Sequence, residues 1–442
     1  MSRDTAVLAD GVPRPLDHAG LRALAERFGT PSYVYDLAAL REAATALRAD
    51  LPAGAELLYS VKANPHPLVI RELAACGLRT EISSLGELAA VRSAGARLED
   101  ALYTGPGKTP GELRSALGAG VRQFSVESLA DRDRLARACR DTGTQAEYLV
   151  RLNGPRGSRG GSLRMTGRPT AFGTDWRARD DLAALFASAG PARPIGTHTF
   201  SATNVEDPQA LAVELRQSLA TSAEVARSAG FVPELLDLGG GFPAPMAQPG
   251  PLRRFPALAG TLAAALDAHF PGRGQDGGPR VAFETGRHLT AAAGTLLTTV
   301  VDVKRSGDRT FVVLDSGVNV LGGMSGLGRL MAPRTMPVPV LPAEGAGPAV
   351  LAASGPGGAS TVRASLVGPL CTPLDMLNPA VELADPRPGQ LLAVPNTGAY
   401  GLTASLVGFL SRPAPVEITV DGPTLVAARQ LKLQTTEVEA ND

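Results

Sequence analysis

The sequence predicts a (β/α)8 TIM barrel followed by a C-terminal antiparallel β domain, and three observations lead to this fold class. Between residues 56 and 286, short apolar runs alternate with amphipathic helical segments. The chain has 442 residues, and a single core rarely organises more than roughly 250–300 residues. After residue 290, β-branched runs replace the helical periodicity. We therefore expect a barrel over residues 34–289 and a β domain over residues 290–442, to which part of residues 1–33 also belongs.

Eight apolar runs are the expected barrel strands. They are residues 56–63, 78–84, 101–105, 122–128, 146–153, 194–201, 235–241 and 280–286. The segments between them, such as 67–77 and 85–95, carry apolar residues at three- and four-residue spacing and end in glycine, as helices often do. A doubly wound open sheet is the alternative, but it normally uses fewer strands and leaves less room for a second domain.

The expected β domain begins with residues 295–317, which form two β-branched runs joined by a Ser-Gly-Asp turn. Further expected strands are residues 349–354, 363–369, 390–396 and 415–422. Residues 153–168 are rich in Gly and Arg, and residues 341–360 are rich in Ala, Gly and Pro. We interpret these two stretches as loops.

The composition favours a cytoplasmic protein that acts on a small molecule. The 43 basic and 43 acidic residues balance, which argues against nucleic acid or a membrane surface as a partner. Three cysteines (Cys76, Cys139 and Cys371) are too few for a disulfide framework. The N-terminus lacks the apolar region of a signal peptide, and no apolar run approaches the roughly 20 residues of a membrane helix.

Active sites of these barrels lie at the carboxyl ends of the strands. Lys62 ends the first expected strand. A lysine at this apolar position is partly desolvated, which lowers the pKa of its amine and makes the amine nucleophilic. The alternative is an ordinary solvated lysine. His198 ends the sixth strand, where a histidine that serves only the core is the alternative interpretation.

The last two barrel strands end in residues suited to an anion and a heterocycle. Gly239, Gly240 and Gly241 follow the seventh strand, where backbone N–H groups can approach a phosphate closely; a plain turn is the alternative. Glu284 could keep a pyridine nitrogen protonated, and Arg287 could hold a phosphate; a mutual salt bridge is the alternative. An amine, an anion cradle, a carboxylate and an aromatic stacking partner are together what pyridoxal 5'-phosphate (PLP) requires.

An ordered series of short motifs then marks a resemblance. The motifs are Y-S-V-K-A-N (59–64), E-I-S-S-L-G-E-L (81–88), Y-T-G-P-G-K (103–108), S-V-E-S (125–128), H-T-F-S (198–201), L-G-G-G-F (238–242), F-E-T-G-R (283–287), L-D-S-G (314–317), G-P-L-C-T-P-L-D (368–375) and G-A-Y (398–400). This series resembles the fold-type III PLP-dependent decarboxylases, such as ornithine and diaminopimelate decarboxylases, which are related to alanine racemase. The resemblance covers roughly residues 30–405 and implies the same two-domain fold.

The resemblance implies a role for each matching residue. Lys62 would carry the cofactor as a Schiff base, and His198 would stack on the pyridine ring. The other residues expected to contact the cofactor are Glu81, Ser201, Gly239, Gly240, Gly241, Glu284, Arg287 and Tyr400. Glu284 would pair with the pyridine nitrogen, which favours decarboxylation over racemisation because alanine racemases place an Arg there.

The C-terminal motif of this family reaches into the active site of the neighbouring protomer. The resemblance therefore implies a homodimer with composite sites, in which Cys371 is the acid that protonates the product. Asp375, Thr372 and Phe200 are the residues expected to contact the substrate. A PLP-dependent racemase or epimerase and a non-catalytic PLP-binding protein are the alternative functions.

Three departures from the family pattern concern the substrate. Phe200 replaces a glycine and should reshape one edge of the pocket. Thr372 replaces an acidic residue that reads a distal amine. Residues 319–334 lack the Arg-Pro segment that grips the distal carboxylate in diaminopimelate decarboxylases. This last segment resembles a specialised-metabolism subgroup, so the expected substrate is an amino acid or a derivative of one, free or linked to a carrier protein. Arg156, Arg159, Arg164 and Arg168 could meet an anionic partner, or simply lie in a solvated loop.

Overall fold

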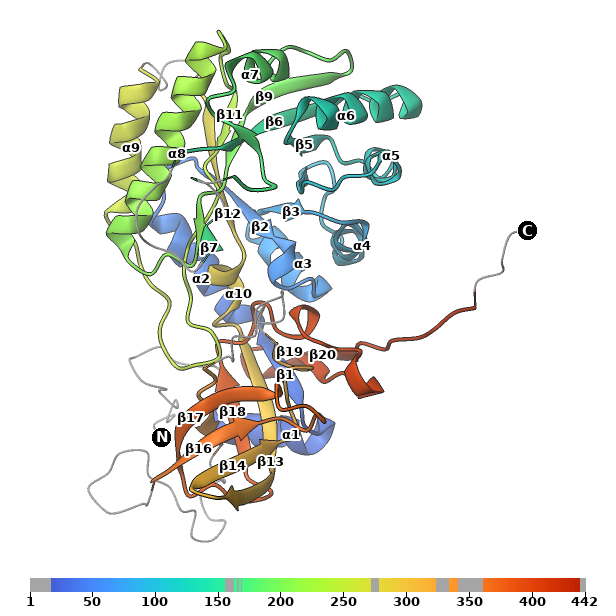
Figure 1. Cartoon of the computed structure of the whole chain (residues 1–442), viewed down its shortest axis with the longest axis vertical. Helices are drawn as coiled ribbons and strands as arrows, with labels where there is room; N and C mark the ends of the chain where they lie inside the picture. The colour runs from blue at the N-terminus through green and yellow to red at the C-terminus, as the bar shows by residue number, and fades with distance from the viewer. Residues whose placement is uncertain are drawn as a thin grey trace. The chain divides into compact units, whose positions relative to one another are not determined.

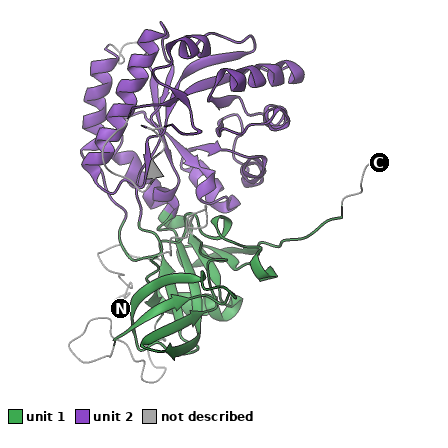
Figure 2. Ribbon diagram, in the orientation of Figure 1, with its two compact units in different colours: residues 1–39, 245–251, 291–442 green, residues 40–244, 252–290 purple. Residues whose placement is uncertain are grey.

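The computed structural model describes residues 17–155, 163–164, 167, 169–271, 278–322, 334–340 and 361–437. The chain divides into two compact units, which are coloured separately in Figure 2. The barrel unit comprises residues 40–244 and 252–290, and the β unit comprises residues 1–39, 245–251 and 291–442. Residues 245–251 therefore belong to the β unit although barrel residues precede and follow them in the sequence.

The barrel unit is a ring of parallel strands with helices around it (Figure 1). Within the described residues the ring contains eight strands, and the pairing of β5 with β6 closes it. The strands are β2 (Glu56–Ser60), β3 (Arg79–Ile82), β4 (Leu102–Tyr103), β5 (Gln123–Val126), β6 (Ala146–Asn153), β9 (Ala192–Thr199), β11 (Leu235–Asp237) and β12 (Arg280–Thr285). Short strand β8 (Thr174–Asp175) pairs with β6, and β10 (Ala202–Thr203) pairs with β7 (Leu163–Arg164). The predicted (β/α)8 barrel is confirmed.

Nine helices of this region are described, and several of them, though not α7 and α9, have a side chain that caps the first turn. They are α2 (Leu37–Ala49), α3 (Pro67–Ala75), α4 (Leu85–Ala94), α5 (Pro110–Gly118), α6 (Leu129–Thr142), α7 (Arg179–Leu185), α8 (Pro208–Ser228), α9 (Leu258–His269) and α10 (Arg287–Thr290). The side chain of Thr109 accepts a hydrogen bond from the backbone of Glu112, whose carboxylate bonds back to Thr109. Gly143 ends α6 in the left-handed conformation, which a glycine adopts without steric cost.

The interior of the barrel is filled by one apolar side chain from each of several strands. Leu58, Leu102, Leu149, Ile195, Leu235 and Ala282 form one buried cluster. Further along three of these strands, toward their carboxyl ends, lie the polar residues His198, Asp237 and Glu284. The packed layer therefore separates the amino-terminal rim of the barrel from the mouth where Lys62, His198 and Glu284 lie.

The amino-terminal rim is bound together by a chain of polar side chains on neighbouring strands. Its members are Arg280, Glu56, Arg79, Gln123, Glu147, Arg193 and Glu234, each bonded to the next. The backbone N–H of Arg280 donates to the carbonyl oxygen of Glu234 at 2.9 Å, which brings the two ends of the chain together. Networks of this kind stabilise more than isolated surface pairs, because each charge has several partners.

Glu56 accepts hydrogen bonds from two arginines, Arg79 and Arg280. Removing its charge should therefore lower stability more than removing a charge that has one partner. We expect Glu56→Gln to lower the free energy of unfolding by about 1–2 kcal/mol. Urea unfolding of the variant and the parent measures the difference. Glu99→Gln is the matched control, because Glu99 forms an exposed pair with Arg97 and should change stability by less than about 0.5 kcal/mol. Equal losses for the two variants would contradict a special role for the rim.

The β unit contains one sheet, in the order β17-β16-β14-β13-β1-β19-β20, with β18 paired to β13 and β15 paired to β18. Its elements are α1 (His18–Phe28), β1 (Ser32–Asp36), β13 (Gly294–Ser306), β14 (Arg309–Leu314), β15 (Val338–Pro339), β16 (Thr361–Val367), β17 (Met376–Ala384), β18 (Leu391–Pro395), β19 (Val416–Asp421) and β20 (Thr424–Gln430). The expected strand at 349–354 lies outside the described residues.

The sheet is mixed, which corrects the expectation of a purely antiparallel domain. β1 runs parallel to β19, and β14 runs parallel to β16. The other pairings of the sheet that the structure describes are antiparallel. The parallel pairs join strands that are distant in the chain, and no local turn signal encodes such a pairing.

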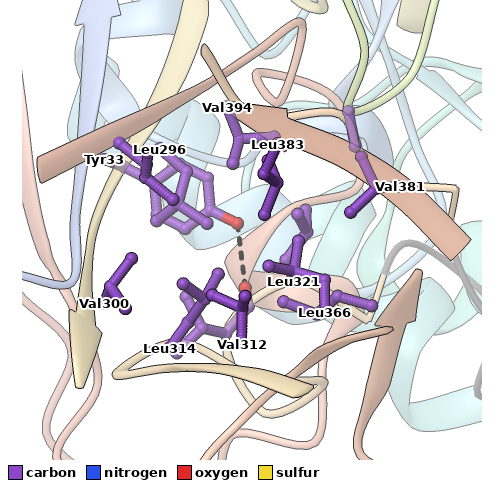
Figure 3. Close-up of a cluster of buried hydrophobic side chains, with 14 of the residues drawn as sticks. Tyr33, Leu296, Val300, Val312, Leu314, Leu321, Leu366, Val381, Leu383 and Val394 are labelled. Atoms are coloured by element: carbon purple, nitrogen blue, oxygen red, sulfur yellow. Dashed lines mark hydrogen bonds between the residues drawn. The ribbon is translucent and has the colours of Figure 1, made fainter. Parts of the chain in front are cut away.

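An apolar core lies between the strands of the β unit (Figure 3). Its labelled members come from the N-terminal strand β1, from strands beyond residue 290 and, for Leu321, from the loop after β14, so N-terminal residues help to build this unit. The hydroxyl of Tyr33 donates to the carbonyl oxygen of Val320 at 2.8 Å inside this core. In the described part of the chain, no helix has the length and hydrophobicity to cross a membrane.

Candidate active site

Lys62 lies just beyond strand β2, in the short helical turn η1 (Val61–Ala63), rather than within the strand as expected. Its Nζ atom lies 2.8 and 3.0 Å from the two carboxylate oxygens of Glu81 at the end of β3. Thr104, after β4, donates to one of the same oxygens at 2.5 Å. Three successive strands therefore position the amine and its counter-ion.

The environment of Lys62 differs from the desolvated one that we expected. The Lys62 side chain is 41% exposed, whereas that of Glu81 is 1% exposed. The barrel mouth leaves the amine accessible, and a buried carboxylate stabilises its charged form. An accessible amine can meet a carbonyl compound, and it must give up its proton before it attacks.

The second part of the site is a buried cluster of three ionisable side chains at the ends of β9, β11 and β12. His198, Asp237 and Glu284 offer oxygen and nitrogen atoms that lie within 4.8 Å of one another. His198 Nδ1 shares a hydrogen bond of 2.7 Å with Ser125 Oγ, so the hydroxyl orients the imidazole. His198 Nε2 faces Glu284 Oε1 at 3.2 Å.

The three groups shift one another's pKa values. Burial by itself would raise the pKa of Glu284, but the neighbouring His198 lowers it below its usual range. Burial and the charge of Glu284 raise the pKa of Asp237 to about 7. Burial would lower the pKa of His198, yet Glu284 raises it. Glu284 is therefore the member of the cluster whose ionised form its neighbours favour most.

The triglycine turn passes too close to its neighbours for any side chain. A Cβ atom at Gly239 would lie 2.2 Å from the carbonyl oxygen of Thr199, and one at Gly240 would lie 2.2 Å from that of Glu284. Gly239 and Gly241 also have φ values of +72° and +106°, which favour glycine. The N–H of Gly239 is bonded to Asp237 Oδ1 at 2.9 Å. Those of Gly240 and Gly241 make no hydrogen bond to the described residues and remain as donors for an anion.

Ser201 and Phe200 border this turn. A Cβ atom at Gly240 would lie 3.4 Å from the Phe200 ring, so the ring that replaces the family's glycine lies against the turn. Ser201 Oγ is 3.0 Å from Ser218 Oγ in α8. Arg287 is the first residue of α10, directly after the strand that carries Glu284. The barrel residues that we predicted are thus brought together at one end of the strands.

Sequence reasoning missed three contributors. Asp237 fixes the triglycine turn, and Ser125 orients His198. The third is Arg151, whose Nη1 donates to Glu127 Oε1 at 3.0 Å. Glu127 itself lies in the S-V-E-S motif at a strand end, as expected, and its Oε2 accepts from the N–H of Gly173. Arg151 is the β6 partner of His198 in the strand register. Their position at carboxyl strand ends was the available signal, but it does not tell an orienting residue from one that contacts a ligand.

The predicted residues of the β unit lie on two loops of that unit. Cys371 is exposed, and Thr372 Oγ1 accepts a hydrogen bond from the N–H of Leu374 at 3.3 Å. Asp375 is buried, and both of its carboxylate oxygens accept backbone bonds. Tyr400 adopts a φ of +53°. The side chains of Arg156, Arg159, Arg164 and Arg168 lie outside the described residues.

These features fit a cofactor with a carbonyl carbon, a pyridine ring and a phosphate. Glu284 Oε1 and His198 Nε2 are buried and face each other at 3.2 Å, with no other partner among the described residues. The carboxylate can therefore accept from a ring nitrogen, and the imidazole can pack against a ring. Two donors of the triglycine turn are available to an anion, and a lysine amine is available to a carbonyl. The fold and the site together define a barrel enzyme that uses pyridoxal phosphate.

Comparison with known proteins identifies the family. Residues 37–291 match the pyridoxal-binding domain of the pyridoxal-dependent decarboxylases, and this chain belongs to that family. The L-glutamyl-[BtrI acyl-carrier protein] decarboxylase of Niallia circulans is 28% identical, covering 91% of each chain. The diaminopimelate decarboxylase of Pseudomonas aeruginosa is 32% identical, covering 95% of this chain and 93% of that one. The protein is a PLP-dependent decarboxylase, as the sequence predicted.

Solved structures agree with this fold. The Helicobacter pylori diaminopimelate decarboxylase, crystallised with L-lysine, superposes with a TM-score of 0.76 at 22% identity and covers 93% of this chain and 95% of its own. The predicted fold-type III architecture is thereby confirmed. The similarity at this level of identity concerns the fold.

The raised pKa of Asp237 leads to a prediction for the cofactor-free protein. A carboxyl group whose folded pKa is about 7 holds its proton more tightly in the folded protein than in the unfolded chain. Its contribution to stability is fully present only below the ordinary pKa of an aspartate. That stability is lost as the pH rises through about 7. Asp237→Asn removes this titration but keeps an oxygen for the N–H of Gly239. We expect the variant to be more stable than the parent by roughly 2–4 kcal/mol at pH 8, with a much smaller difference at pH 4. Urea unfolding of both proteins at both pH values measures the difference in the free energy of unfolding. An equal difference at pH 4 and pH 8 would contradict the prediction.

Proposed function

We propose that this enzyme removes the α-carboxyl group of an amino-acid unit that carries no distal ammonium, and that the unit is linked to a carrier protein. The observation that supports this proposal is the loop of residues 368–375. Its only acidic side chain, Asp375, is 3% exposed and has both oxygens bonded to the backbone. The residue after Cys371 is the neutral Thr372. Among its described residues this loop therefore offers no available carboxylate to a distal ammonium.

Two kinds of relative suggest substrates. The Niallia circulans relative is named as a decarboxylase of an L-glutamyl group on an acyl-carrier protein, and glutamate has no distal ammonium. Diaminopimelate decarboxylation is the second candidate. The relative in Actinosynnema pretiosum that bears this name is 34% identical. Diaminopimelate carries an ammonium and a carboxylate at its distal end, and the neutral Thr372 disfavours it.

We propose these roles in the barrel. When bound, PLP would draw electrons away from the α carbon as the carboxylate leaves. Lys62 would hold the cofactor covalently, with Glu81 as its counter-ion. Glu284 would hold a proton on the pyridine nitrogen, because it stays ionised in a buried site. His198 would pack on the ring in the orientation set by Ser125.

The phosphate would be held by the two available N–H groups of the triglycine turn, with Arg287 supplying the positive charge. Ser201 and Tyr400 would complete this cradle. Phe200 lies against Gly240, and we propose that its ring narrows the substrate pocket beside the cradle. Cys371 would protonate the product, and Thr372 would contact the substrate side chain.

We further propose that the enzyme is a cytoplasmic homodimer in which Cys371 serves the partner's site. Support comes from an exposed apolar patch on the loops around Cys371. Leu374, Leu406, Phe409 and Leu410 are 42–53% exposed. The loops that carry them are linked: Leu406 bonds to Val318, and Arg412 bonds to Pro369. Large exposed apolar side chains that cluster in this way are typical of protein interfaces.

One assay tests the substrate proposal. Purified protein loaded with PLP is supplied with L-glutamyl-acyl-carrier protein, free L-glutamate, free diaminopimelate or free lysine, and release of CO2 is measured. We expect the carrier-linked substrate to give a kcat/KM at least about tenfold above each free amino acid. Higher activity on free diaminopimelate would support the second candidate and overturn the first. Mixing the inactive Lys62→Ala protein with the impaired Cys371→Ala protein should raise activity above that of either variant if the sites are composite, and no recovery would contradict the shared site.

A further inference from the structure

We infer that Asp375 is a positioning residue for Cys371, rather than a residue that contacts the substrate. This inference rests on the proposed role of Cys371 as the acid. It goes beyond that role by assigning what fixes the thiol in place. The starting point is the pairing of β14 with β16, which run parallel. The loops that follow these two strands, residues 315–322 and 368–375, therefore begin at the same end of the sheet.

A single carboxylate joins these two loops. Asp375 Oδ1 accepts from the N–H of Val318 at 2.7 Å, and Oδ2 accepts from the N–H of Leu370 at 2.7 Å. Leu370 directly precedes Cys371, so the bond fixes the peptide that leads into the cysteine. The backbone of Asp375 closes the same turn, since its oxygen accepts from Gly368 at 3.0 Å and its N–H donates to Thr372 at 3.2 Å. Bonds to an ionised acceptor are stronger than neutral ones.

Two glycines allow the loops to approach the carboxylate. A Cβ atom at Gly317 would lie 2.3 Å from Asp375 Oδ1, and one at Gly368 would lie 2.3 Å from Oδ2. Neither glycine has a φ in the left-handed region. Space beside Asp375, and not backbone conformation, explains why these positions carry no side chain. The glycines of L-D-S-G and G-P-L-C thus serve the same carboxylate.

The loop that Asp375 holds is itself anchored to the core of the β unit. Val320 accepts from the buried hydroxyl of Tyr33 at 2.8 Å, and the N–H of Gly322 donates to Ser405 Oγ at 2.7 Å. Asp315, at the start of the loop, accepts from Thr298 and from Thr30. Asp375 therefore connects this well-anchored loop to the exposed turn that carries Cys371, and so restrains the turn. With both oxygens already bonded and 3% exposure, it is poorly placed to bind a substrate.

The experiment compares the PLP-loaded parent with Asp375→Asn. Asparagine keeps the shape but replaces one acceptor with a donor, which opposes one of the two N–H groups. We expect amide hydrogen exchange at Val318 and Leu370 to speed up by about tenfold or more. We expect the rate of Cys371 alkylation by iodoacetamide to change by at least about threefold, followed by mass spectrometry so that Cys76 and Cys139 are scored separately. With the preferred substrate, kcat should fall while KM changes little, because the thiol acts after binding.

Asp50→Asn is the matched control. Asp50 is also buried and also accepts a backbone bond, from Phe255 at 2.7 Å, but it belongs to the barrel unit. It should lower stability and leave Cys371 alkylation unchanged. Unchanged exchange and alkylation in Asp375→Asn would overturn the inference, as would a large rise in KM with unchanged kcat. The exchange and alkylation measurements need no substrate, so they test the inference even if the parent releases no CO2. Absence of CO2 release would refute the proposed function and leave the inference about Asp375 to these two measurements.

Discussion

Lys62→Ala should lower CO2 release by at least about a thousandfold and remove the visible absorbance of the bound cofactor. The reason is geometric. Among the described residues, Lys62 supplies the amine that follows β2 and faces Glu81 at the barrel mouth. Removing it would delete the proposed covalent attachment of the cofactor, and it leaves the 1%-exposed Glu81 without the lysine cation beside it. Absorbance spectra of the purified protein with added PLP, together with the CO2 assay, measure both effects.

Lys62→Arg separates the loss of chemistry from the loss of charge. Arginine keeps a cation beside Glu81 but cannot form an imine, since it stays protonated. We expect it to fold as stably as the parent and to be as inactive as Lys62→Ala. Lys304→Ala, on an exposed part of β13, is the control for removing a lysine and should retain full activity. An active Lys62→Arg protein would show that this amine does not carry the cofactor.

The barrel could be predicted because its evidence is local. Each strand and helix shows its own periodicity, and active sites of this fold lie at the carboxyl ends of the strands. Those two facts are enough to predict from the sequence that Lys62, His198 and Glu284 share one barrel mouth. The chemistry of these residues pointed to PLP, and the resemblance added the reaction. The mixed sheet of the β unit was not predictable, because β1 pairs with β19 across almost the whole chain.

Partners inside the site were harder to predict than the site itself. Glu81 was expected to touch the cofactor, and the structure shows that it pairs with Lys62. Asp237 looked like the last residue of a strand, yet it supports the triglycine turn. Such roles depend on which side chains face each other across the barrel. That arrangement follows from strand register and tilt, which sequence periodicity does not specify.

Glu284→Gln should have the second largest effect, a fall in kcat of about a hundredfold with a much smaller change in PLP affinity. Glutamine has the same shape but no charge, so it cannot hold a proton on the pyridine nitrogen. Glu284→Ala is expected to be at least as impaired and also to bind PLP less tightly, because it leaves a cavity in a buried cluster. Steady-state kinetics and PLP titration separate the two effects.

The same substitution has a consequence in the cofactor-free protein that needs no activity to observe. Burial lowers the pKa of His198, and the charge of Glu284 raises it above its usual value. In the Glu284→Gln variant that charge is gone while the burial remains, so the pKa of His198 should fall. Titration of the five histidines by NMR, with Ser125→Ala used to assign the His198 signal through its 2.7 Å bond, measures the change. An unshifted His198 together with an unchanged kcat would mean that Glu284 is not the ionised group of this cluster, and the electrostatic argument for decarboxylation would then lose its basis.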